Sequence, residues 1–267
     1  ALLARWQEPD NGVWETVERR RYTYGKVMAW IGLAAGSKLS KKRRTELSKV
    51  RAEIHNQVLE AGLQRENGFL ASEYHGSEID ASSLLAFTSD FLSSDLARAT
   101  RERVELELAQ GALVFRNESQ RAQGEGAFLL CSFWLVNHLS KEGEMERAEQ
   151  LLEELLGRLS PLGLFAEEID PRSGHFLGNF PQAFSHLGLI GTILNLDLAK
   201  NRPECARLSD HEKFQRTVGP TVGFRGVIAG FWRVPKTFTL LFSNRSKWKE
   251  DLSSDRAGWS HLFRREG

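Results

Sequence analysis

Apolar residues recur along most of the chain with the spacing of α-helices. In residues 43–63, Leu47, Val50, Ile54 and Val58 follow one another every three or four positions, which places them on one helix face with Lys, Arg and Glu opposite. The same period is present in six further segments. The chain is therefore predicted to be all-α, with helices at residues 20–36, 43–63, 81–92, 94–109, 126–142, 144–159 and 180–199.

Three of these segments carry further information about the fold. Residues 126–142 are apolar nearly all round, which predicts a buried inner helix. Residues 144–159 carry one leucine-rich stripe, which is typical of an outer helix. Pro181 is expected in the first turn of the last helix, where its fixed backbone angle fits.

Long loops rich in Gly, Asn, Asp and Glu separate the helices. Loops of this kind on a helical scaffold commonly carry function. Short apolar runs at residues 68–71 and 113–116 predict small strands inside two of them. The four loops cover residues 9–19, 64–80, 110–125 and 160–179.

Charge changes along the chain near residue 200. Residues 201–267 contain 13 Lys and Arg against 7 Asp and Glu, whereas the residues before them contain 23 against 28. We therefore expect two parts, a helical part in residues 1–200 and a basic extension of unknown role in residues 201–267.

The overall composition argues against several classes of protein. The net charge of +1 over 267 residues gives no electrostatic drive toward nucleic acid or membrane, and no run of about 18 apolar residues predicts a membrane-spanning helix. Two cysteines do not make a disulfide framework, and Cys131 is expected to pack as a small apolar residue. His and Cys lack metal-ligand spacing. We expect neither a metal nor another cofactor.

Two acidic segments carry the candidate chemistry. In the first, Glu15 follows Trp14 in a loop opened by Pro-Asp-Asn-Gly, and a carboxyl shielded from water by Trp14 suits a general acid. In the second, Glu167 and Glu168 stand together in a predicted turn and suit the binding and deprotonation of a water. Taken separately, each has a plainer interpretation: a surface Glu beside a packing Trp, and a solvated acidic loop that caps the last helix.

Four further features have both a functional and a structural interpretation. Glu125 is expected at the N-terminus of the helix at 126–142, where the helix dipole stabilises a carboxylate. Arg116 suits a fork onto sugar hydroxyls or a carboxylate, or an ordinary surface ion pair. Asp80 is expected to cap the helix at 81–92. The basic run at 38–44 is interpreted as a solvated helix start, not a nucleic-acid site.

Several blocks of sequence, taken in order, resemble bacterial members of glycoside hydrolase family 15, the glucoamylase and trehalase family. They include Pro-Asp-Asn-Gly-Val-Trp-Glu, Lys-Val-Met-Ala-Trp and Asp-Ala-Ser, then Glu-Gly-Ala-Phe-Leu-Leu-Cys-Ser-Phe-Trp-Leu-Val and finally Ala-Glu-Glu-Ile-Asp-Pro with Gly-Asn-Phe-Pro-Gln-Ala-Phe-Ser-His. These blocks occupy residues 9–15, 26–30, 80–82, 125–136, 166–171 and 178–186.

The resemblance implies a fold and a set of roles. The family fold is an (α/α)6 barrel of twelve helices in two rings, with the active site in loops at one end. The family inverts the anomeric configuration, so Glu15 matches the general acid and Glu167 the general base. Two such carboxyl groups are expected about 6.5–9.5 Å apart, with room for a water. By the same resemblance Trp14, Arg116 and Glu125 line the sugar pocket.

Two departures from the family pattern limit this match. The relatives follow Trp-Glu with Val-Arg and a Gly-containing turn, whereas this chain continues Thr-Val-Glu-Arg-Arg-Arg, so the pocket contact of that Arg does not carry over. Only about seven of the twelve helices are expected, and the chain begins without Met. We therefore expect the C-terminal portion of the catalytic domain, an incomplete barrel whose N-terminal half is missing.

The function implied is hydrolysis of α-glucosidic bonds with inversion, releasing glucose from the ends of maltooligosaccharides or starch. Hydrolysis of α,α-trehalose is the alternative within the same family. A catalytically silent helical domain that binds a sugar or a partner is the alternative from another class. Low cysteine use and the bacterial-type motifs favour the cytoplasm.

Overall fold

The computed structural model describes residues 2–66, 68–88 and 90–201. The chain divides into two units, Ala1–Ala199 and Lys200–Gly267. The fold that follows is that of the first unit. Apart from Asn201, the predicted basic extension lies outside the described residues, and so does Cys205.

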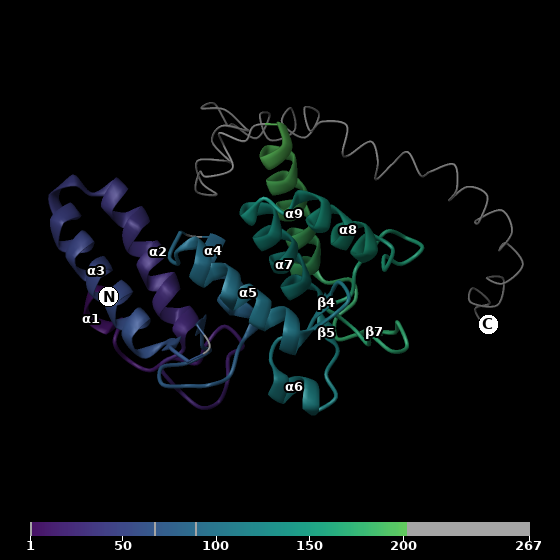
Figure 1. Ribbon diagram of the computed structural model, residues 1–267, viewed down its shortest axis with the longest axis horizontal. Helices are drawn as coiled ribbons and strands as arrows, with labels where there is room; N and C mark the ends of the chain where they lie inside the picture. Colours follow the sequence, from purple (N-terminus) through teal and green to yellow (C-terminus); the bar gives the residue numbers. More distant parts are fainter. Residues whose placement is uncertain (1, 67, 89, 202–267) are drawn as a thin grey trace, which may run out of the picture. The chain divides into compact units, whose positions relative to one another are not determined.

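Helices dominate the described residues (Figure 1), and the predicted all-α class is confirmed. They are α1 (Leu2–Arg5), α2 (Thr23–Leu39), α3 (Arg44–Ala61), α4 (Leu84–Thr88), α5 (Ser94–Leu108), α6 (Glu118–Ala122), α7 (Leu129–Glu142), α8 (Met145–Leu156) and α9 (Ala183–Asn201). Two 3-10 turns precede α3 and α4, η1 (Lys41–Arg43) and η2 (Ala81–Ser83).

The strands are all two residues long and lie between the helices. Antiparallel pairs join β1 (Leu63–Gln64) to β2 (Phe69–Leu70) and β3 (Ala109–Gln110) to β4 (Leu113–Val114). A three-stranded sheet has the order β5 (Ala127–Phe128), β6 (Glu168–Ile169) and β7 (Phe176–Leu177). The strands predicted at 68–71 and 113–116 are thus present, in shorter form.

Consecutive helices pack together as hairpins: α2 with α3, α4 with α5, and α7 with α8. Helix α4 also contacts α7, which links one hairpin to the next. Helix α9 lies against α7, because Thr192 Oγ1 accepts a hydrogen bond from the Asn137 amide at 3.0 Å and Gly188 approaches the ring of Phe133 closely. A helical hairpin is the repeating unit of an (α/α)6 barrel.

Burial along α7 and α8 confirms the predicted inner and outer helices. Helix α7 buries most of its surface, including Phe133, Val136 and the thiol of Cys131, and its remaining face is partly buried. Helix α8 buries only Ala148, Leu152 and Leu155, one stripe of its surface. Burial raises the pKa of the Cys131 thiol well above its usual range, so Cys131 behaves as the expected apolar residue.

Three predictions about where helices and loops lie were wrong. The helix predicted at 81–92 ends at Thr88, and Phe91 beyond it is buried among other aromatic rings. Pro181 precedes α9 and is not in its first turn, since the helix begins at Ala183. The loop at 110–125 contains α6, which Asn117 caps by accepting a hydrogen bond from the backbone N–H of Gln120.

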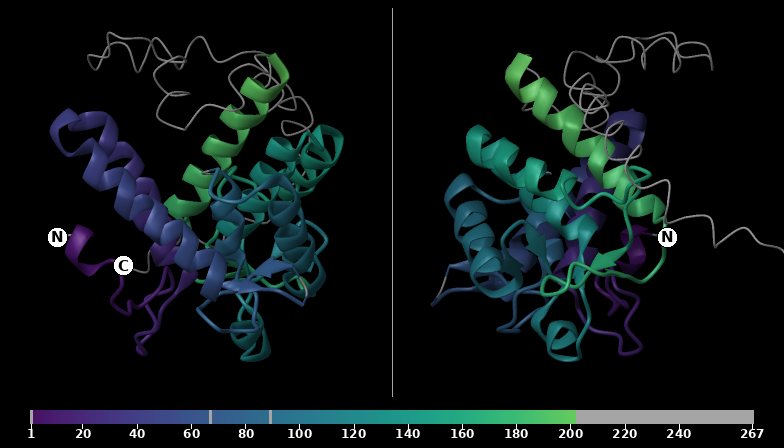
Figure 2. Two further views of the ribbon diagram at one scale, coloured as in Figure 1. Left: turned by 60° about the vertical axis from the view of Figure 1, so that its left-hand side comes forward. Right: turned by 90° about the vertical axis from the view of Figure 1, so that its right-hand side faces the viewer.

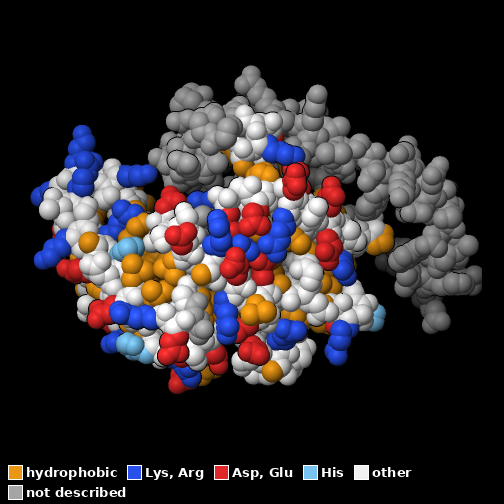
Figure 3. Space-filling view, viewed as in Figure 1, with side chains coloured by type: hydrophobic (Ala, Val, Ile, Leu, Met, Phe, Trp, Pro, Cys, Tyr) orange, Lys and Arg blue, Asp and Glu red, His pale blue; other side chains and the backbone are white. Residues whose placement is uncertain are grey.

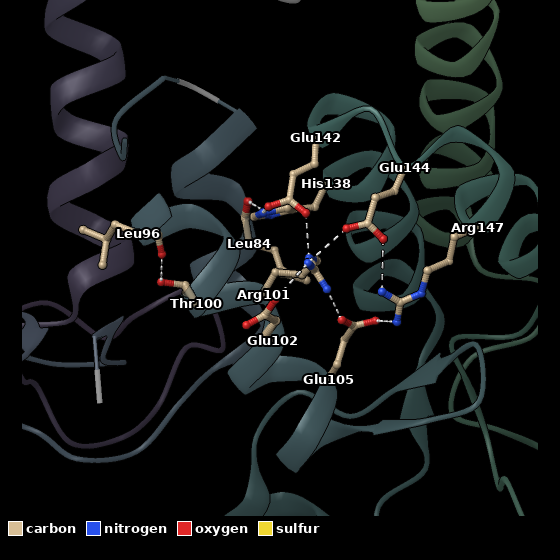
Figure 4. Close-up of polar contacts among 10 residues, drawn as sticks. All are labelled: Leu84, Leu96, Thr100, Arg101, Glu102, Glu105, His138, Glu142, Glu144 and Arg147. Atoms are coloured by element: carbon tan, nitrogen blue, oxygen red, sulfur yellow. Dashed lines mark hydrogen bonds and ion pairs between the residues drawn. The ribbon is translucent and has the colours of Figure 1, made fainter. Parts of the chain in front are cut away.

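A buried arginine joins three of the helices (Figure 4). Arg101 of α5 is 3% exposed and donates from Nε to Glu142 of α7 at 2.8 Å. It also pairs with Glu105 of its own helix and, at 3.2 Å, with Glu144 just before α8. Arg147 of α8 extends the network through Glu105 and Glu144. We call these five residues the Arg101 cluster.

Loops gather at one end of the helices. In Figures 1 and 2 the loop between α1 and α2, the short strands and α6 all lie at the lower end of the drawing. Figure 3 shows acidic and basic side chains interspersed over one face. Among the described residues, no helix combines the length and apolar character needed to cross a membrane.

Candidate active site

The first acidic segment forms a closed loop between α1 and α2. Asp10 and Arg20 exchange backbone hydrogen bonds of 2.8 and 2.9 Å at its base. Lys26 of α2, 2% exposed, donates from Nζ to Asp10 Oδ2 at 3.0 Å. At the tip, Glu15 has a φ of 52°, in the left-handed region that costs energy for any residue other than Gly. A strained residue in a tethered loop is a common feature of functional sites.

The ring of Trp14 is held on several sides. Its indole Nε1 donates to Asp80 Oδ2 at 2.6 Å. Phe128 meets it edge-on with ring centroids 5.7 Å apart, and Trp134 lies tilted at 6.0 Å. Glu15 itself is exposed. The expectation that Trp14 shields Glu15 from water was wrong, because the Trp14 ring packs on the aromatic residues around α7.

Arg116 stands between aromatic rings and carboxylates. Its guanidinium carbon lies 5.4 Å from the ring centroids of both Trp14 and Phe128. Arg116 also pairs with Glu125, and its Nη2 is 3.7 Å from Glu168 Oε1. Its side chain is 19% exposed. We call Arg116 with Glu125 and Glu168 the Arg116 cluster, which presents hydrogen-bonding groups beside a flat aromatic surface.

The place of Glu125 differs from the prediction. It was expected at a helix N-terminus, but β5 (Ala127–Phe128) lies between Glu125 and the start of α7 at Leu129. The apolar run begins with an extended pair of residues because β5 pairs with β6. Glu125 therefore contacts Arg116, and the helix dipole does not explain its position.

The second acidic segment is a strand and not the predicted turn. Glu168 and Ile169 form β6, and the chain turns after Asp170, which accepts the backbone N–H of Arg172 at 3.0 Å. Glu167, just before β6, accepts two hydrogen bonds at Oε2: 2.9 Å from the backbone N–H of Asn179 and 2.8 Å from its side-chain amide. One oxygen of this carboxylate is therefore fixed.

Two glycines make these contacts close. A Cβ added at Gly178, whose φ is 67°, would lie 2.7 Å from Glu167 Oε2. At Gly126 a Cβ would lie 3.0 Å from the Ile169 carbonyl, and its backbone N–H donates to Glu168 Oε2 at 3.1 Å. A larger residue at Gly178 would displace the Glu167 carboxylate, and one at Gly126 would press on strand β6.

The pKa of Glu168 reflects this enclosure. Burial raises it, against the lowering effects of the Gly126 N–H and Arg116. The charges of Glu125 and Glu167 act in the same direction as burial. A carboxyl with a raised pKa among other carboxyls is typical of sites that handle protons.

Strand pairing joins the two acidic segments. Phe128, which contacts Trp14, pairs with Glu168 in the β5–β6 ladder. The next residue, Leu129, donates its backbone N–H to the Glu167 carbonyl at 3.1 Å. The structure thus brings Trp14, Arg116 and Glu125 together and connects them to the Glu167 segment. The separation of the Glu15 and Glu167 carboxyls stays a prediction.

Sequence reasoning missed several residues of this region. Phe128 and Trp134 were interpreted only as apolar helix residues, although their rings support Trp14. Asn179 lies inside the quoted Gly-Asn-Phe-Pro block, and its neighbour Gly178 signalled a close approach of backbone to side chain. Asp80 was interpreted as a helix cap only, which it is, but it also binds Trp14. No cluster of His, Cys, Asp and Glu suited to a metal occurs among the described residues.

Comparison with known proteins finds trehalases among the relatives of this chain. The chain is 40% identical to a trehalase of Mycolicibacterium smegmatis over 215 residues, 76% of this chain and 32% of the relative. It is 39% identical to a trehalase of Mycobacterium tuberculosis with the same coverage. A trehalase of Thermoplasma volcanium is 33% identical over 73% of this chain and 33% of its own length. The chain thus spans about a third of the length of these relatives.

Solved structures agree in fold. A wild-type glycosidase and a variant of a glycosidase in complex with glucose each align with a TM-score of 0.64 at 23% identity. The alignments cover 74% of this chain and 56% of the solved chains. They support the (α/α)6 type of fold for the described helices. The model of the glycosyl hydrolases family 15 matches residues 2–194, and the chain belongs to this family.

Proposed function

We propose that this chain supplies the catalytic loops of an inverting hydrolase of α-glucosidic bonds. One observation carries the proposal: Trp14, next to Glu15, packs on Phe128 of the strand that pairs with the Glu167–Glu168 segment. Two carboxylate segments beside aromatic rings form the set of groups that glycoside hydrolysis uses.

In this proposal Glu15 is the general acid and Glu167 the general base. Asn179 holds Glu167 Oε2, which leaves Oε1 to accept a hydrogen bond from a water. The water attacks the anomeric carbon and gives a proton to Glu167, while Glu15 gives its proton to the departing glycosidic oxygen. Trp14 supplies a flat face for the sugar, and Arg116 and Glu125 bind its hydroxyl groups.

The substrate that we propose first is α,α-trehalose. The sequence alone favoured maltooligosaccharide ends, but the relatives compared above are named trehalases. Maltooligosaccharides become the second candidate. Because the chain matches only about a third of these relatives, we propose that full activity also needs the part of their length that this chain does not match. A cytoplasmic location, favoured by low cysteine use, is testable by cell fractionation.

The test is glucose release from trehalose and from maltotriose by the wild-type chain, alone and after co-expression with the unmatched N-terminal region of a relative. Glu15→Gln and Glu167→Gln are each expected to lower kcat at least about 100-fold, since each removes one proton-transfer group. Glu18→Gln is the matched control, because Glu18 lies in the same loop and pairs with Arg20. Equal losses in all three variants, or no turnover by the wild type in either form, would contradict the proposal.

A further inference from the structure

The tip of the first loop is held on both sides of Glu15. Backbone hydrogen bonds between Asp10 and Arg20 fix the base of the loop, but Glu15 lies at the tip, in a left-handed conformation. On the C-terminal side of Glu15, Thr16 is held in two ways: its backbone N–H donates to the Asn11 carbonyl, and its hydroxyl lies 2.8 Å from the hydroxyl of Tyr22. On the N-terminal side, the direction of the Glu15 side chain depends on the anchor of its neighbour Trp14.

Asp80 supplies that anchor from a segment 66 positions along the chain. The 2.6 Å bond from Trp14 Nε1 to Asp80 Oδ2 is a directional contact, whereas Phe128 and Trp134 contact the ring only through its faces and edges. Asp80 is 6% exposed, so its carboxylate stays in place. The bond forms inside the protein, where water competes for it little.

Asp80 is itself fixed on three sides. Its Oδ1 accepts the backbone N–H of Ser82 at 2.7 Å, which caps η2. Its backbone bridges Asn117, and the following residue, Ala81, donates to the Arg116 carbonyl at 2.9 Å. The carboxylate that holds Trp14 thus belongs to the same rigid junction as Arg116. Burial raises the pKa of Asp80, and the hydrogen bonds from Ser82, Trp14 and Asn117 lower it.

We propose that Asp80 is a positioning residue for the general acid: its bond to Trp14 fixes the loop tip and so aims the Glu15 carboxyl at the glycosidic oxygen. The inference rests on the proposed function. Asp80 touches no substrate in this role and acts only through Trp14. A misplacement of a reacting group by about 1 Å is enough to cost about 100-fold in rate.

Asp80→Ser separates the two roles of Asp80. Serine still caps η2 through Ser82, because Ser and Asp are both good N-caps, but its side chain is too short to reach the Trp14 indole. Trp14→Phe removes the same hydrogen bond from the other side and keeps an aromatic ring. We expect each variant to lower kcat about 10- to 100-fold. For Asp80→Ser, KM should change less than about threefold, whereas for Trp14→Phe KM should also rise because the smaller ring offers less surface to the sugar.

The decisive measurement is a double-mutant cycle in kcat on trehalose, with the folded fraction of each variant measured by circular dichroism. If the bond carries the effect, the double variant has about the same kcat as the less active of the two single variants. Losses that multiply, or an Asp80→Ser variant within about twofold of wild type, would overturn the positioning role. A wild-type chain inactive in every form would overturn the proposed function itself, and the positioning role with it.

Discussion

Two arginines of this chain stand among carboxylates, and their surroundings differ in one respect. Arg101 is 3% exposed and is enclosed by acidic residues of three helical segments. Arg116 leaves 19% of its side chain exposed and faces aromatic rings as well as acids. Arg101 itself is enclosed, with only Glu144 and Arg147 at the edge of its cluster partly exposed, whereas the Arg116 cluster leaves both Arg116 and Glu125 partly exposed. In our proposal the first cluster stabilises the helices and the second binds the sugar.

The largest expected effect on stability comes from removing the arginine of the Arg101 cluster. Arg101→Met leaves Glu142 buried at 4% exposure without its arginine partner, and breaking a buried pair in this way costs about 3–5 kcal/mol. Urea unfolding at neutral pH measures the change. Arg43→Met, which removes an exposed pair with Glu46, is the control and is expected to leave stability unchanged. An Arg101→Met variant as stable as the control would remove the distinction between the two clusters.

A substitution in the Arg116 cluster is expected to lower enzymatic activity and to leave the free energy of unfolding almost unchanged. Arg116→Lys keeps the charge but loses the planar fork that spans Glu125 and the rings. We expect kcat/KM for trehalose to fall about 10- to 100-fold, the effect of one or two lost hydrogen bonds in a substrate site. The free energy of unfolding is expected to change by less than about 1 kcal/mol. A loss of stability with full activity in the remaining folded protein would contradict the recognition role.

Acid titration sharpens the comparison for Glu142. Burial raises its pKa, but His138 and Arg101 outweigh burial, so the pKa lies below its usual value of 4.5. A carboxyl with a lowered native pKa stabilises the fold above its unfolded value, and this stability is lost as the pH falls through the native value. The unfolding free energy should therefore drop below about pH 4.5, and Glu142→Gln should flatten that drop. The same loss of unfolding free energy below pH 4.5 in wild type and in Glu142→Gln would refute this.

Glu168 of the Arg116 cluster should affect the pH dependence of stability in the opposite direction to Glu142, and by less. Burial raises its pKa, so ionisation costs the folded state stability, and the cost grows as the pH rises through its unfolded value. Glu168→Gln, which keeps an acceptor for the Gly126 N–H, is expected to be as stable as wild type or slightly more stable at pH 7. Trehalose turnover should fall because Arg116 loses a neighbour. Destabilisation at pH 7 would show that Glu168 belongs with Glu142.

Local patterns predicted most of the helices, because packing and periodicity agree there. The α7 segment buries Phe133 and Val136 as its apolar surface indicated. The pattern failed where distant partners decide the conformation. Helix α4 stops at Thr88, and residues 168–169 become a strand because β5 and β7 pair with them.

The sequence indicated candidate site residues but not their arrangement. Residue types and the family resemblance pointed to Trp14, Arg116 and Glu125, which lie together in the structure. Nothing local indicated that Asp80 reaches Trp14, because that hydrogen bond joins segments 66 residues apart in the chain. The bond from Asn179 to Glu167 joins residues 12 apart, and it forms because β6 and β7 pair between them. Only the fold supplies that information.

The most direct measurement is the anomeric form of the first glucose released, followed by proton NMR before mutarotation. Inversion of α,α-trehalose by Glu15 and Glu167 predicts β-glucose and α-glucose in equal initial amounts, since only the attacked ring changes configuration. Glu167→Gln should release neither. Initial release of α-glucose alone would mean retention, and the assignment of Glu167 as the base that activates a water would then be wrong.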